Sequence, residues 1–149
     1  MTFSDSIRSQ LGADETVAAR LMEMTWVAED MWNLVFRFRW KDLGPVEVRT
    51  ASLADHAAVR DFLTEGLSAR SRYLFAPYPM NERLDVSIEK MLVDSGKREQ
   101  LTYNAWHGGR VIGHFFLWEY DQDTPALGIA VADAFQNCKL GHVFMHILT

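Results

Sequence analysis

Residues 126–149 read ALGIAVADAFQNCKLGHVFMHILT, and this stretch decides the fold. Its first six residues form an apolar run typical of a buried strand, residues 132–136 predict a turn, and the apolar spacing from Leu140 predicts a helix. A helix that opens after such a turn has free backbone N–H groups at its start, and the helix dipole adds to their field. The residues alone therefore suggest an anion site, although an ordinary strand–helix connection explains them too.

The preceding sequence predicts a mixed α/β fold of the α+β type, with a mainly antiparallel sheet flanked by helices. Ser52, with Asp55 three residues later, resembles a capping box and predicts the start of a helix. The segment His107-Gly-Gly-Arg110 predicts a hairpin turn, since glycine tolerates positive φ. The predicted elements are helices over 52–67 and 81–93, and strands over 46–50, 101–106, 111–120 and 126–131.

The N-terminal residues 1–45 are predicted to be an extension with a helix and a strand, preceding a domain over 46–149. Apolar residues such as Val17, Leu21 and Met24 recur at intervals of three and four, which predicts a helix over 14–35. Residues 35–40 alternate apolar and basic side chains, which predicts a strand. Its two arginines indicate a solvated strand face or, alternatively, a contact to a ligand phosphate.

Composition narrows the class of protein. The chain has 149 residues with 48% hydrophobic and 23% charged residues, which is typical of one globular domain. A net charge of −5 argues against a general nucleic-acid binder. The single cysteine excludes an internal disulfide, and no apolar run is long enough to span a bilayer. Without a secretory signal at the N-terminus, we expect a soluble cytoplasmic protein that binds neither nucleic acid nor membranes.

Four stretches in this order resemble the GNAT N-acetyltransferase superfamily. They correspond to the family's first strand and helix, a segment after that helix, the turn between its second and third strands, and its cofactor motif. The resemblance covers roughly residues 46–149. The stretches are VEVRTASLADH (46–56), LSARSRYL (67–74), WHGGRVIGH (106–114) and LGIAVADAFQNCKLGH (127–142).

This resemblance implies an N-acetyltransferase that transfers an acetyl group from acetyl-CoA to a small amine or a protein lysine. The family's phosphate loop reads Arg/Gln-x-x-Gly-x-Gly/Ala, with Gln136 and Gly141 in the first and last places. Lys139 replaces the middle glycine, and its side chain either blocks a diphosphate or pairs with it. The cofactor-binding residues that the resemblance implies are Ile129, Ala130, Val131, Gln136, Asn137, Cys138, Lys139, Leu140, Gly141 and His142.

The expected catalytic groups only partly match the family. Acetyl transfer needs a base for the amine, a donor that polarises the thioester and an acid for the leaving thiolate. Ala126 stands where many members carry a glutamate, so Glu119 is the best substitute as the base, ahead of His114 and Asp121. The polarising donor would be a backbone N–H near residues 129–131. No residue matches the family's tyrosine acid.

Two other groupings are weaker. Cys138 and His142 could form a nucleophile–base pair, although no third group orients them. His142 and His146 lie four residues apart, as metal ligands often do, but no third ligand is evident and we expect no metal.

The family's later strands have no counterpart in this sequence. The predicted sheet would then have an exposed edge, and the last helix would have an uncovered side. We therefore expect a homo-oligomer that covers both, or alternatively residues 1–45 folding back over the gap. The alternatives to an enzyme are a non-catalytic CoA-binding or regulatory module and an oligomeric interaction domain without a ligand.

Overall fold

The computed structural model describes residues 2–74, 81–118, 126–136 and 138–148. These residues form one antiparallel sheet of six strands, and the order of the strands across the sheet follows their order in the chain. The architecture is therefore the mixed, mainly antiparallel α+β fold that the sequence predicts. The strands are β1 (Leu21–Asp30), β2 (Asn33–Trp40), β3 (Gly44–Thr50), β4 (Leu101–His107), β5 (Arg110–Trp118) and β6 (Ala126–Val131).

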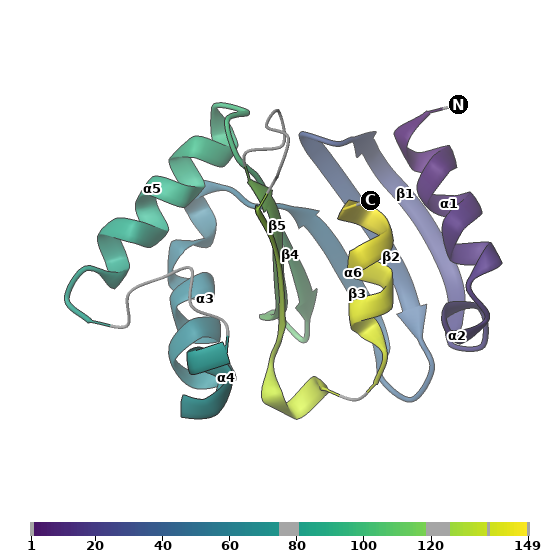
Figure 1. Ribbon diagram of the computed structural model, residues 1–149. Helices are drawn as coiled ribbons and strands as arrows, with labels where there is room; N and C mark the ends of the chain where they lie inside the picture. The colour runs from purple at the N-terminus through teal and green to yellow at the C-terminus, as the bar shows by residue number, and fades with distance from the viewer. Residues whose placement is uncertain (1, 75–80, 119–125, 137, 149) are drawn as a thin grey trace.

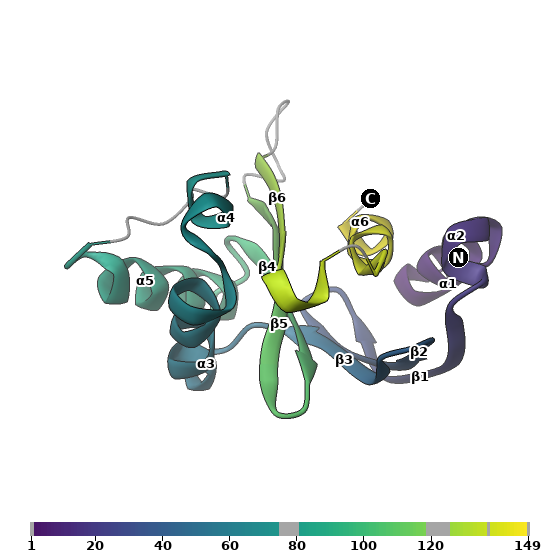
Figure 2. The same ribbon diagram turned by 90° about the horizontal axis from the view of Figure 1, so that it is seen from below.

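Helices cover both faces of the sheet, as Figure 1 and Figure 2 show. Each face has its own cluster of buried apolar side chains. One face is covered by α1 (Phe3–Ala13), α2 (Glu15–Ala18) and α6 (Leu140–Leu148). The other is covered by η1 (Leu53–Asp55), α3 (His56–Asp61), a π-helical turn η2 (Phe62–Gly66), α4 (Ala69–Leu74) and α5 (Leu84–Gly96).

Strand β2 shows why the alternating sequence forms a half-buried strand. Phe36 and Phe38 are buried against the cluster beneath α1 and α6, whereas Arg37 and Arg39 are exposed on the opposite face. Arg37 pairs there with Glu47 of β3 at 3.0 Å. This pairing supports the prediction of a solvated strand face.

The helix predicted over residues 14–35 is wrong. Only residues 15–18 are helical within that range, and β1 occupies residues 21–30. Apolar residues also recur at even spacing there, so that Met24 and Trp26 lie opposite Phe38 and Phe36 of β2. The Trp26 and Phe36 rings stack with centroids 4.1 Å apart. Strand pairing and this packing outweigh the helical spacing, which is a local signal.

The N-terminal strands belong to the same sheet as the rest of the chain, since β2 pairs with β3 through residues 35–40 and 44–49. The division at residue 45 stays a prediction. No helix in the described part of the chain is long and apolar enough to cross a membrane.

The last helix is covered within the chain. Helix α6 buries Val143, Phe144 and Ile147, and the Phe144 ring stacks on Phe115 of β5 with centroids 4.5 Å apart. From α1 and its C-cap, Gln10 and Asp14 contact His146 at 3.1 and 2.8 Å. Residues 1–45 therefore fold back over the last helix, as one alternative predicts, but in the described part of the chain they do not cover the outer edge of β6.

Candidate functional site

The strand–turn–helix unit forms as the sequence predicts. Strand β6 ends at Val131, a single helical turn η3 (Asp133–Phe135) follows, and α6 begins at Leu140. The backbone N–H groups of Leu140 and Gly141 donate no hydrogen bond to any other residue that the structure describes. Asn137, one of the predicted cofactor-binding residues, lies outside the described residues. The start of α6 therefore presents free donors, as an anion site requires.

Lys139 has a left-handed backbone conformation. Its φ is 71°, in the left-handed region that residues with a Cβ rarely adopt. The side chain is exposed and makes no ion pair within the described residues. This position therefore has a backbone conformation that glycine adopts more readily than lysine.

Space is open beside Gly141. A Cβ placed on this residue would have no atom within 4 Å outside its own helical backbone and its chain neighbours. Packing therefore does not require glycine at this position, whereas close approach of a ligand to the backbone would.

Gln136 is held by the protein itself. Its side-chain amide donates to the carbonyl oxygen of Val131 at 3.0 Å and to Oδ1 of Asp133 at 3.3 Å. Hydrogen bonds from Ser71 and Ser68 hold the pKa of Asp133 below its ordinary value. Gln136 thus braces the turn and ties it to the start of α4.

Three further predicted residues anchor the loop. The Cys138 thiol donates to the carbonyl oxygen of Phe135 at 2.7 Å, and the Cys138 carbonyl accepts from the Trp40 indole at 2.8 Å. Leu140 is buried. His142 lies 3.5 Å from Asp14, between Nδ1 and Oδ2. The side chains of Cys138 and Leu140 thus face protein atoms, whereas the His142 side chain is 46% exposed.

Strand β6 has an open outer edge. It pairs with β5 on one side, and no strand lies on its other side within the described residues. The N–H of Ala132 donates to Ile112 of β5, and N–H directions alternate along an antiparallel ladder. Ala130 therefore points its N–H at β5, whereas Ile129 and Val131 point theirs at the open edge.

The structure describes one of the three candidate bases, His114. His114 is fully buried, with Nδ1 2.7 Å from Oδ1 of Asn104. Burial lowers the pKa of His114 to about 3, so it cannot exchange protons with a substrate in solution. Glu119 and Asp121 lie outside the described residues.

His142 and Cys138 do not form the alternative catalytic pair, because the thiol is bonded to a carbonyl and the imidazole faces Asp14. His146 is engaged by Gln10 and Asp14. Within the described ranges, no three His, Cys, Asp or Glu side chains are grouped to hold a metal.

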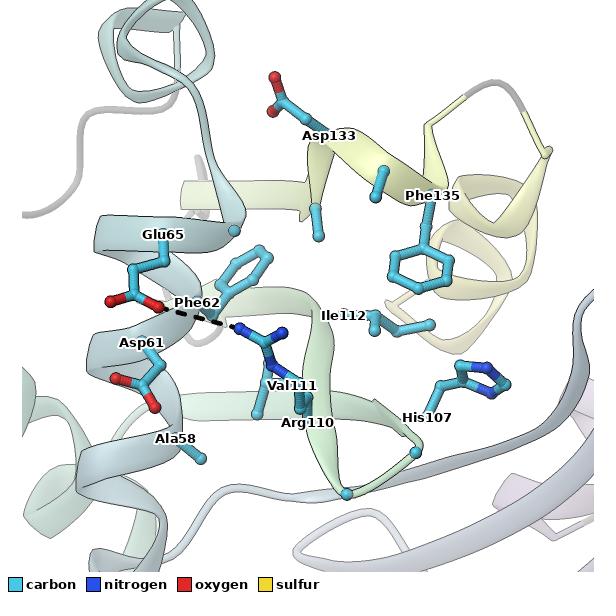
Figure 3. A pocket seen from close by; sticks show the side chains of 15 residues that line it. Ala58, Asp61, Phe62, Glu65, His107, Arg110, Val111, Ile112, Asp133 and Phe135 are labelled. Atoms are coloured by element: carbon cyan, nitrogen blue, oxygen red, sulfur yellow. Dashed lines mark ion pairs between the residues drawn. The ribbon is translucent and has the colours of Figure 1, made fainter.

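A pocket that sequence reasoning missed lies on the α3 face of the sheet (Figure 3). It has a volume of about 530 Å³ and is lined by α3, η2, the β4–β5 hairpin and η3. Because these segments are far apart in the sequence, no local motif could have revealed it.

Comparisons with known proteins identify the fold. No protein-family model matches the sequence, and no match was found among the curated proteins. One solved structure, the GNAT domain of S. lividans PAT, is similar with a TM-score of 0.55 and 21% sequence identity. The match covers 81% of this chain and 72% of that domain. The chain has the GNAT fold.

Proposed function

We propose that this chain binds acetyl-CoA and transfers its acetyl group to an amine. The observation that carries the proposal is the start of α6, where the N–H groups of Leu140 and Gly141 are free and Lys139 has a left-handed backbone. The fold of the GNAT domain of S. lividans PAT supports the same assignment. Both features suit a diphosphate, which needs main-chain donors and close approach to the backbone.

The residues of the loop have different roles in the proposed binding. Leu140 and Gly141 supply the donors, and the helix dipole adds about 0.3–1 kcal/mol for an anion at an exposed helix start. Gln136, Cys138 and the side chain of Leu140 hold the backbone in place through the contacts described above. Only Lys139 brings a positive charge to the loop itself.

The open edge of β6 supplies the second part of the site. The outward N–H groups of Ile129 and Val131 suit an extended amide chain such as the pantetheine arm of the coenzyme. One of them is the proposed donor that polarises the thioester carbonyl as it gains negative charge. Glu119 stays the predicted base, and E119Q should lower the rate of thiol release without weakening the binding of acetyl-CoA.

Calorimetric titration of the full chain with acetyl-CoA tests the binding. In the G141A variant, a methyl group occupies the space beside the donors, and we expect affinity to fall by about tenfold or more. The fold should tolerate this change, because nothing lies within 4 Å of the added Cβ. A helical alanine is also worth about 0.5–1 kcal/mol over glycine.

The matched control is G12A in α1, a glycine that likewise has open space around it and lies outside the loop. It should leave the affinity unchanged. Acetylpantetheine lacks the diphosphate, so its affinity should change little in either variant. If G141A binds acetyl-CoA as tightly as the unmodified chain, the diphosphate is not at this loop.

A non-catalytic CoA-binding module is the second candidate, because Ala126 occupies the family's glutamate position and His114 is sealed in the core. Thiol release in the presence of a panel of amines separates the two functions. Binding without thiol release would favour the module.

Self-association through the edge of β6 remains a proposal, as does a cytoplasmic location. Leu127 is 44% exposed at this edge, and an unpaired strand edge recruits other chains. A clean monomer in light scattering would exclude a stable oligomer. The expected partner remains an amine acceptor, and we still expect no binding to nucleic acid or to membranes.

A further inference from the structure

The ring of His146 lies between two oxygen atoms where α6 contacts the N-terminal helices (Figure 1). Its Nε2 is 2.8 Å from Oδ2 of Asp14, and its Nδ1 is 3.1 Å from Oε1 of Gln10. The amide nitrogen of Gln10 donates to Oγ of Ser6 at 3.5 Å, which turns the amide oxygen towards the ring. A neutral imidazole has one N–H and can donate to one of the two oxygens, whereas the protonated ring donates to both. The arrangement therefore favours a proton on each nitrogen.

Asp14 accepts hydrogen bonds from both α2 and α6. Its Oδ1 accepts from the backbone N–H groups of Thr16 and Val17 at 3.0 and 3.4 Å, which caps the start of α2. Its Oδ2 faces His146 and also lies 3.5 Å from Nδ1 of His142, one turn earlier on α6. The hydrogen bond with His146 is the largest cause that holds the pKa of Asp14 below its ordinary value. One carboxylate, charged at neutral pH, thus faces two rings that can each take up a proton.

This contact is partly shielded from water. The side chains of Asp14 and His146 are 20% and 23% exposed, compared with 46% for His142. The helices that carry them share one buried apolar cluster, to which they contribute Leu11, Val17, Val143 and Ile147. Solvent therefore screens the pairing of Asp14 with His146 less than it screens a fully exposed pair.

Asp14 is the carboxylate that pairs with both rings, and no other described carboxylate forms an ion pair with either of them. Strand β6, which packs against α6, has no titratable side chain. The titratable residues of β5 contact the opposite face of the sheet, through Glu65 and Phe62, and are Arg110 and His114. The other charged side chains near this contact are bonded elsewhere or exposed, and are Asp5, Arg8, Glu15, Arg20 and Lys139. Asp14 therefore dominates the charge that the two rings experience.

We propose that Asp14, His142 and His146 form a proton-sensitive clasp that ties α1 and α2 to α6. With both rings neutral the clasp has a formal charge of −1, and one proton gives it an internal ion pair. Histidine titrates in water at about pH 6.5. Because the folded chain binds the proton more favourably than the unfolded chain, the clasp contributes its stability below about pH 6.5 and loses it as the pH rises towards 8. The clasp holds the helix whose start carries the free donors, but it does not depend on acetyl-CoA.

Urea unfolding of the full chain and of D14N, at pH 6 and at pH 8, tests the proposal. Asparagine keeps an acceptor that caps α2 but removes the charge. We expect the unfolding equilibrium constant of D14N to exceed that of the unmodified chain by about fivefold at pH 6 and by less than about twofold at pH 8. Groups that titrate equally in both chains cancel in this ratio.

A second variant and a matched control locate the effect. H146Q keeps a donor for Asp14 but cannot titrate, so D14N should lose most of its pH dependence when the two changes are combined. The control is D85N, because Asp85 lies 3.1 Å from Nε2 of His56 and is 57% exposed. Solvent screens that pair, so the effect of D85N should differ by less than about twofold between the two pH values.

The proposal is overturned if D14N has the same effect at pH 6 and pH 8, if its pH dependence persists in full beside H146Q, or if D85N is equally dependent on pH. H146Q compared with the unmodified chain at the two pH values gives an answer even if D14N does not fold. These measurements need no coenzyme, so a failure of the proposed acetyl-CoA binding leaves them unaffected.

Discussion

Replacing Lys139 with glycine should stabilise the fold. A residue with a Cβ loses about 1–2 kcal/mol in the left-handed conformation, and Lys139 has a φ of 71°. Glycine also makes the unfolded chain more mobile, which opposes the gain by about 0.4–1 kcal/mol. The net expectation is that K139G raises the free energy of unfolding by about 0.5–1 kcal/mol.

Urea unfolding followed by tryptophan fluorescence measures this difference, with K139A as the matched control. Alanine removes the ammonium group but keeps the Cβ, so its stability should stay close to that of the unmodified chain. If K139A gains as much as K139G, the gain comes from removing charge and not from the backbone. If K139G is less stable than the unmodified chain, the assigned strain at this residue is wrong.

The same two variants decide what the lysine does to the coenzyme. If its side chain blocks the diphosphate, K139G should bind acetyl-CoA more tightly, and K139A should show little of that gain because it keeps the Cβ. If its ammonium pairs with a phosphate, both variants should bind acetyl-CoA more weakly than the unmodified chain. This difference in affinity should shrink at high salt, which screens the ion pair. We favour the steric interpretation.

Two further predictions concern the core. G113A should destabilise the fold by about 1–3 kcal/mol, measured by thermal unfolding, because the added Cβ would lie 2.6 Å from the Phe144 ring; an unchanged melting temperature would refute this packing. His114 is buried in its neutral form with a pKa of about 3, below the ordinary 6.5. Its contribution to the free energy of unfolding is therefore complete above pH 6.5 and is lost as the pH falls towards 3, because the unfolded chain is protonated first. The slope is about 1.4 kcal/mol per pH unit, and H114Q, which keeps a donor for Asn104, should reduce the slope of stability between pH 6.5 and 5; an equal slope would contradict the assignment.

Local patterns predicted the elements that depend on local physics. The glycines of the β4–β5 turn, Gly108 and Gly109, have φ values of 59° and 77°, as a tight hairpin requires. The turn after β6 and the start of α6 follow from the apolar run and its small-residue break. The resemblance to the family's phosphate loop, which has a glycine where this chain has Lys139, also indicated the residue with the left-handed backbone.

Features that depend on distant partners were not predictable. Residues 21–30 carry a helical spacing, but pairing with β2 makes them a strand. The pocket on the α3 face joins α3, a hairpin and η3, none of which signals a site alone. Gln136 matches a phosphate-loop position, yet its amide braces the turn through Val131 and Asp133, a contact that only the fold could reveal.

The central claim is that the free backbone donors at the start of α6 bind the diphosphate of acetyl-CoA. Amide NMR of the full chain during an acetyl-CoA titration tests it directly, because it reports on each N–H separately. We expect the amides of Leu140 and Gly141 to shift most and to saturate, and we expect acetylpantetheine not to shift them. Saturable binding that leaves these two amides unmoved, or no binding at all, would contradict it.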